Sequence, residues 1–223
     1  MIPTVQQALA VARKDLRSEL RTRYALNALG MFVVVTVGVF SFSAGIAQIS
    51  APIAAAMLWT GMFFAAVTGL GRSFISEEER GTTLLLRLSV PSTPVYIGKL
   101  LVNLALAIVS NGLMAFLFSV LMLGVKIASP GDFMLAILLT SIGLASTLTI
   151  IAAIIARTAS KGALYPVLSF PMILPLLMLG VPLLEDSFAG RHDATEGTIL
   201  LLLLYTTTLV VVSYTLFDLL WKE

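Results

Sequence analysis

Residues 133–156 read FMLAILLTSIGLASTLTIIAAIIA, a run without a single charged side chain. A helix that crosses the hydrocarbon core of a bilayer needs about 20 mostly apolar residues, and this run meets that requirement. Five other runs have the same character. They lie near residues 24–47, 52–71, 100–124, 163–184 and 198–220. With 12% charged residues and a mean hydropathy of +1.00, the sequence predicts an all-α integral membrane protein, a single transmembrane domain of six helices over residues 1–223.

The basic residues indicate how the chain is oriented in the membrane. Of the 14 Lys and Arg residues, all but Lys126 and Arg191 fall in segments that six spans would place on one side. Cytoplasmic segments of membrane proteins are enriched in Lys and Arg, so we expect both termini in the cytoplasm. The sequence pI near 9.0 then reflects this topology and not binding to nucleic acid.

The segment before the first run, residues 1–23, has the pattern of an amphipathic helix. At 100° per residue, four apolar side chains share a narrow arc and three basic ones occupy an adjacent face. The apolar arc holds Val5, Leu9, Leu16 and Leu20, and the basic face holds Lys14, Arg17 and Arg21. We expect this interfacial helix to lie on the membrane with its basic groups at anionic lipid phosphates. A solvated leader is the alternative.

A charged insert, residues 72–99, separates the second run from the third. Ser76 and Glu79 have the spacing of a capping box, in which each side chain bonds the backbone N–H of the other at a helix N-terminus. The three consecutive acids would then lie in the first turn, where they favour the positive end of the helix dipole. Leucines between residues 84 and 88 add a short apolar surface before Pro91. They need cover from the membrane surface, neighbouring spans or a partner protein.

The insert resembles the cytoplasmic coupling helix of ABC-exporter permeases. The likeness rests on the run EERGTTLLL at residues 78–86, followed by Pro91 and by GKL at residues 98–100. The six spans, the leading amphipathic helix and the position of the insert agree with that group. The resemblance implies that coupling to the ATPase is carried by Ser76, Glu77, Glu78, Glu79, Arg80, Gly81, Thr82, Leu85 and Leu88.

Within that group the chain most resembles the heme exporter protein B (CcmB) family, the membrane permease subunits of the cytochrome c maturation ABC transporter. The length, Gly98-Lys99 and the run YPVLSFPMILP at residues 165–175 carry this likeness, whereas the three acids before Arg80 are closer to general exporter permeases. The resemblance implies a homodimer, a CcmA-like ATPase that holds the ATP, and CcmC-like and CcmD-like membrane partners. It also implies heme as cargo, no cofactor bound by this chain, and a bacterial-type inner (plasma) membrane.

Two other functions fit the residues: the permease of a generic ABC exporter for lipid, drug or glycan, and a non-transporting membrane scaffold. The sequence has no Gly-x-x-x-x-Gly-Lys-Ser/Thr phosphate loop, so we do not expect an ATPase or any other enzyme. No charged residue lies at the middle of an expected span, which disfavours a proton-coupled transporter. The sole histidine, His192, is expected to be solvated in an external loop, and no metal site is expected.

Prolines at positions 166, 171, 175 and 182 fall in or near the fifth run. Each removes a backbone donor and clashes with the carbonyl four residues earlier, so we expect residues 163–197 to form a kinked or broken fifth span and an external loop. Pro171 and Pro175 then either flank a translocation route or bend a packing helix. The third run carries polar side chains that either pack against another helix or face a translocation route, and helix packing is preferred. They are Asn103, Ser110 and Asn111.

Overall fold

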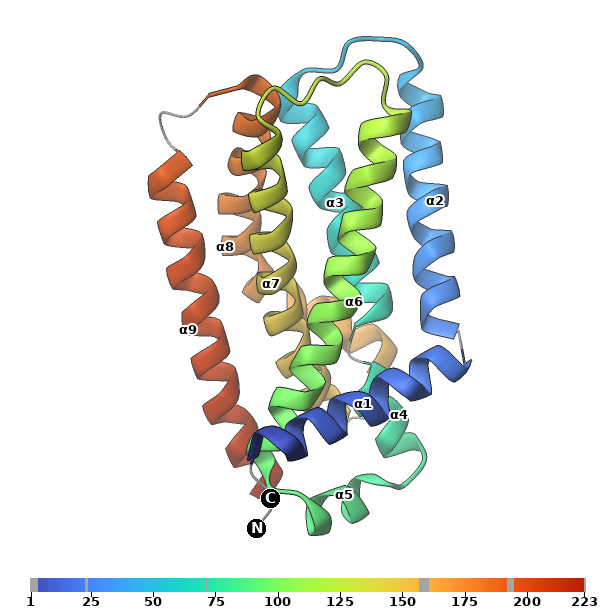
Figure 1. The fold of residues 1–223 in the computed structure, drawn as a ribbon, viewed down its shortest axis with the longest axis vertical. Coiled ribbons are helices and arrows are strands. Elements are labelled where there is room, and N and C mark those ends of the chain that lie inside the picture. Colours follow the sequence, from blue (N-terminus) through green and yellow to red (C-terminus); the bar gives the residue numbers. More distant parts are fainter. Residues whose placement is uncertain (1–3, 23, 71, 157–160, 192–194, 223) are drawn as a thin grey trace.

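The computed structural model of the chain describes residues 4–22, 24–70, 72–156, 161–191 and 195–222. All regular structure in these ranges is α-helical, as expected, and the long helices stand side by side (Figure 1). The helices are α1 (Thr4–Thr22), α2 (Tyr24–Ala44), α3 (Ala51–Gly69), α4 (Arg72–Glu79), α5 (Thr83–Ser89), α6 (Ser92–Leu121), α7 (Pro130–Ile155), α8 (Lys161–Ala189) and α9 (Thr195–Lys222).

The number of spans predicted from the sequence is confirmed. Within the described residues, six helical segments are long and apolar enough to cross a membrane. They correspond to α2, α3, α6, α7, α8 and α9, one helix for each segment. Helices suit this environment because their backbone hydrogen bonds are made within one segment. The third span begins earlier than expected, at Ser92, so Lys99 lies inside α6 and not in a loop of the insert.

Of the two forms expected for the fifth span, kinked or broken, the broken form is wrong. α8 is one continuous helix that contains all four prolines, and it packs along α3, α7 and α9. Proline is tolerated in membrane helices where neighbouring helices satisfy or cover the freed backbone. The hydroxyl of Tyr205 on α9 donates to the carbonyl of Met172 on α8 over 2.7 Å, so a side chain of α9 joins the proline-containing part of α8. The connection after α8 therefore begins only at Gly190, and His192 lies outside the described residues.

α7 is the central helix of the bundle, with contacts to α3, α4, α6, α8 and α9. Its buried face is rich in small residues, which lets neighbouring backbones approach closely. At Gly143 a Cβ atom would lie 2.6 Å from the side chain of Leu176, so α8 could not pack this closely against a larger residue. The absence of a side chain at Gly143 therefore lets α8 pack directly on α7.

One end of the bundle carries the three short or crossing helices, and we call it the α1 end (Figure 1). α1 lies across the ends of the spans and packs on α6, while α4 and α5 lie beside it. Gly98 permits this crossing, because a Cβ there would lie 2.7 Å from the carbonyl oxygen of Ala8. The end of α9 also reaches this side, so the segments expected to be cytoplasmic are together at one end.

Candidate functional site

The insert between the second and third spans folds as two short helices and not as one. α4 ends at Glu79, and α5 begins at Thr83. Ser76 and Glu79 consequently lie in the last turn of α4, and the capping-box prediction is wrong. The three acids lie at the carboxyl end of a helix, where they do not gain from the helix dipole.

A tight turn at Gly81 explains why α4 stops. The N–H of Thr82 donates to the carbonyl of Glu77 over 3.0 Å, and the N–H of Gly81 donates to the carbonyl of Glu78 over 3.1 Å. Gly81 has a φ of +66°, which favours glycine. This pair of bonds around a left-handed glycine is the Schellman motif that ends helices. Gly81 is the signal in the sequence that could have identified a helix terminus here.

α5 presents an apolar surface that the chain itself does not cover. Leu84, Leu85 and Leu88 are each about two thirds exposed or more, and no residue of α5 is buried. The opposite side of α5 is held against the end of α9, where the guanidinium of Arg87 lies 5.4 Å from the centre of the Trp221 ring. The short helix is thus attached on one side and open on the other, and two of the predicted coupling residues are on its open side.

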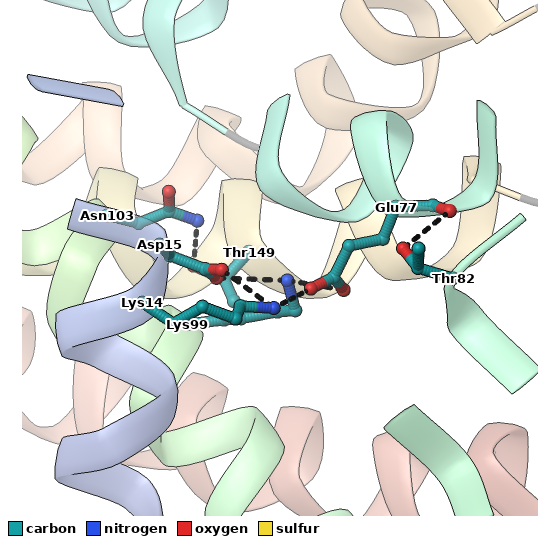
Figure 2. Close-up of polar contacts among 7 residues, drawn as sticks. All are labelled: Lys14, Asp15, Glu77, Thr82, Lys99, Asn103 and Thr149. Carbon is teal, nitrogen blue, oxygen red and sulfur yellow. Dashed lines mark hydrogen bonds and ion pairs between the residues drawn. The ribbon is translucent and has the colours of Figure 1, made fainter. Parts of the chain in front are cut away.

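Behind α5, four charged side chains from three helices meet in one cluster (Figure 2). The ammonium of Lys99 on α6 lies 3.1 Å from Asp15 Oδ2 on α1 and 2.8 Å from Glu77 Oε2 on α4. Lys14 on α1 contacts both acids as well, with 3.1 Å to Asp15 Oδ1 and a hydrogen bond to Glu77. We call these four residues the ion cluster. It joins segments that are more than 60 residues apart in the sequence.

Charge balance explains how the ion cluster can be buried. Two ammonium groups face two carboxylates, so the formal charges cancel, and the side chain of Lys99 is fully buried. The Lys99 ammonium also lies 4.5 Å from the centre of the Phe74 ring, a cation–π contact that further stabilises a buried cation. Removing a single partner from such a group leaves an uncompensated buried charge, which is strongly destabilising.

Lys14 is the partly exposed member of the ion cluster, and its pKa is raised. Burial by itself lowers the pKa of Lys14, but the hydrogen bond to Glu77 and the negative charges of Asp15 and Glu77 outweigh that effect. The ammonium form is therefore favoured, and Lys14 keeps its charge at neutral pH.

The sequence reasoning missed Asp15 and Lys99 as site residues. It assigned Lys99 to the cytoplasmic surface, whereas the structure buries it completely. A signal for Asp15 was present: it continues the stripe of Ala8 and Val11 at helical spacing, and all three are buried against the bundle. An acid on the packing face of an amphipathic helix requires a buried cation, although the sequence alone does not say which one.

The predicted coupling residues divide between two surroundings. A hollow of about 370 Å³ lies between α1, α4 and α5, next to the ion cluster. Five of the predicted coupling residues line this hollow. Those five are Ser76, Glu77, Arg80, Thr82 and Leu85. Glu78 lines a narrow gap toward α9, Glu79 and Leu88 are exposed, and Gly81 forms the turn.

The residues considered for a translocation route do not form one site. The amide of Asn103 donates to Thr149 over 2.8 Å, and the amide of Asn111 donates to Ser141 over 3.0 Å, so both asparagines join α6 to α7. The hydroxyl of Ser110 donates to the carbonyl of Ala107 on its own helix over 3.3 Å. Pro171 and Pro175 are on α8, and α7 contacts both α6 and α8 and separates them in Figure 1.

Comparison with known protein families gives a match that covers most of the chain. A family model described as CcmB protein matches residues 6–218, a range that contains the six spans almost whole, the ion cluster and α5. No curated protein matches the chain.

Proposed function

The chain belongs to the CcmB protein family, and on this premise we propose that it is the permease subunit of an ABC transporter complex in which a separate ATPase drives a conformational change. Membership makes it a membrane component of the heme exporter system of cytochrome c maturation, as its resemblance to that family predicted. The chain supplies the membrane part of the complex, and the CcmA-like partner supplies the ATP-binding site.

The observation that carries the proposal is the open apolar side of α5. Leu84, Leu85 and Leu88 project from a seven-residue helix that is attached to the bundle only on its other side. Exposed apolar groups concentrated on one short element are typical of a protein contact. A groove on the ATPase subunit would cover these leucines, and the exposed Glu79 and Arg80 beside them would add polar contacts at the rim.

The ion cluster gives the docked helix a connection to the spans. α5 joins α4 through the turn at Gly81, and Glu77 of α4 contacts Lys99 of α6 and Lys14 of α1. A displacement of α5 by the ATPase would reach α1 and the third span through these charged contacts. Because the contacts are buried and paired, they resist being broken one at a time, and the segments they join move together.

The complex that we propose contains two copies of this chain, two CcmA-like ATPase subunits, and CcmC-like and CcmD-like membrane subunits. It lies in a bacterial-type inner membrane, with α1, α4 and α5 on the cytoplasmic side. Heme is the cargo on which the complex acts. The family match supports this arrangement, because CcmB proteins are components of a heme exporter system that has several subunits.

A pull-down of the tagged chain from its native membrane in mild detergent tests the proposal. Partners are identified by mass spectrometry, and an absorbance spectrum reports heme. We expect an ATPase together with cytochrome c maturation subunits. An ATPase with unrelated partners would favour an exporter of lipid, drug or glycan, and the absence of any ATPase would favour a scaffold.

Paired variants then locate the contact. Leu85→Ser with Leu88→Ser should lower ATPase recovery by roughly tenfold or more, because each buried leucine contributes about 1.5–3 kcal/mol. Leu123→Ser is the matched control, since Leu123 is also highly exposed but follows α6 at the opposite end. Glu79→Gln with Arg80→Gln should weaken binding or lower transport-linked turnover. Unchanged recovery and turnover in both sets would overturn the role of this segment.

A further inference from the structure

A second recess at the α1 end shares only Lys14 with the ion cluster. It is a groove of about 860 Å³ between α1 and α6. This volume is within the range of about 300–1,000 Å³ that is common for small-molecule sites. Its apolar walls are formed by Leu9, Ala12 and Leu16 of α1 and by Leu101, Val102 and Ala105 of α6.

The groove exists because α1 uses only part of its apolar surface for packing. Ala8 and Val11 are buried against α6, whereas Leu9 and Leu16 are exposed. α1 crosses α6 near one end of that membrane-spanning helix (Figure 1). Leu9 and Leu16 of α1 and Leu101 of α6 line the corner between the two helices. A hydrocarbon chain that runs parallel to α6 would fill this corner from the membrane side.

The polar edge of the groove is basic. Arg13 and Arg17 line it, one helical turn apart on the same face of α1, and Lys14 and Gln6 are the other polar residues in its lining. No carboxylate lines the groove. Among the described residues, the ion pairs of α1 use Lys14 and Asp15 and neither arginine. Two guanidinium groups at the mouth of an apolar groove match a phosphate ester with a hydrocarbon tail.

We propose that this groove is a discrete binding site for one anionic phospholipid of the leaflet at the α1 end. Its phosphate lies at Arg13 and Arg17, and one acyl chain lies along Leu101 and Ala105. This site is more specific than attraction of a basic helix to a charged surface, because it requires both the two arginines and the open corner. The bound lipid holds α1 in the position from which Asp15 reaches Lys99.

Native mass spectrometry of the delipidated full-length chain, titrated with equal amounts of phosphatidylglycerol and phosphatidylcholine, tests the site. We expect one preferred phosphatidylglycerol per chain. Arg13→Gln and Arg17→Gln should each weaken its binding roughly fivefold, as expected for one basic group near a lipid phosphate. Arg21→Gln is the matched control, because Arg21 is on the same helix but does not line the groove.

A second pair of variants tests the apolar part without a change of charge. Ala105→Phe fills the groove and should reduce phosphatidylglycerol binding at least as strongly as loss of an arginine. Val109→Phe, one turn further along α6 and outside the groove, should leave binding unchanged. The proposal is overturned if the two lipids bind equally, if Arg21→Gln weakens binding as much as Arg13→Gln, or if Ala105→Phe and Val109→Phe behave alike.

Discussion

Lys99 of α6 and Asp15 of α1 form a buried ion pair, with 3.1 Å between Nζ and Oδ2 and at most 5% of either side chain exposed. Glu77 of α4 approaches the same ammonium to 2.8 Å. One buried cation therefore holds carboxylates from two helices, and one of these helices leads directly into α5. Any movement of the α1 end must keep Lys99 next to Asp15 and Glu77, because separating them would leave buried charges without a partner.

Replacing Lys99 by methionine should strongly destabilise the protein. The variant keeps most of the side-chain volume but leaves two buried carboxylates with only Lys14 to balance them. Removing one partner of a buried pair costs about 3–5 kcal/mol, so the midpoint of thermal unfolding in detergent should fall markedly. Lys126→Met is the control, because Lys126 is exposed at the other end and its loss should change stability by no more than about 0.5 kcal/mol.

Combining Lys99→Met with Asp15→Asn should restore part of the lost stability. The double variant leaves Lys14 opposite Glu77, so the remaining charges cancel again. A positive coupling energy in this double-mutant cycle would establish that the two residues stabilise each other. A double variant that is only as stable as the sum of the single effects predicts would contradict the pairing.

The raised pKa of Lys14 gives a pH dependence with a definite sign. A lysine whose pKa is higher in the folded protein contributes stability that is fully present below its unfolded pKa of about 10.4. That contribution is lost as the pH rises through the folded value. The stability difference between the wild type and Lys14→Gln should therefore be constant from about pH 6 to 9 and shrink at more alkaline pH. A difference that shrinks toward acidic pH would contradict this assignment.

Gly81→Val should disturb the turn between α4 and α5 through backbone strain alone. Apart from Gly81 and its two chain neighbours, no atom lies within 4 Å of the position that a Cβ would occupy, but the φ of +66° is unfavourable for a β-branched residue by about 1–3 kcal/mol. Gly81→Asn should be tolerated better, because asparagine adopts this conformation more readily. Hydrogen exchange should show faster opening of α5 in the valine variant. Gly112→Ala, at an equally open but helical glycine, should show no such effect.

The spans could be predicted from the sequence because a lipid environment permits few solutions. Long apolar runs must become helices that satisfy their own backbone, and hydropathy locates them without knowledge of their neighbours. The sequence wrongly allowed a break in α8, because the cost of its prolines depends on what the surrounding helices cover. Helix packing, not composition, decides whether such a span is broken.

Short-range patterns at the α1 end were ambiguous for a different reason. Ser76 and Glu79 have the spacing of a helix start, but Gly81 ends the helix immediately afterwards, and a left-handed glycine is the stronger signal. The pair Asp15 and Lys99 was out of reach, because nothing local connects residues 84 positions apart. Sequence reasoning could place Glu77 in the segment for which we propose a coupling role, but it could not identify the charges that Glu77 contacts.

Replacing Asn103 and Asn111 by leucine separates helix packing from a role in a route. Their amides bond to Thr149 and Ser141 on α7, and hydrogen bonds between membrane helices contribute about 0.6–1.7 kcal/mol each. We expect each variant to lose stability by that amount while the folded protein keeps its transport-linked turnover. Asn27→Leu, at an exposed position of α2, is the control and should change neither the stability nor the turnover. Lost turnover at unchanged stability would instead assign these asparagines to a route.

Single cysteines test the orientation on which the ATPase proposal depends. The chain has no cysteine, so one introduced thiol is labelled without background. A membrane-impermeant maleimide applied to intact cells should label Gln48→Cys, in the exposed connection between α2 and α3, and should not label Glu79→Cys at the end of α4. Both should react after permeabilisation. The reverse pattern would place α5 outside the cell, where no ATP-hydrolysing partner could reach it, and the leucines of α5 would then need a different partner.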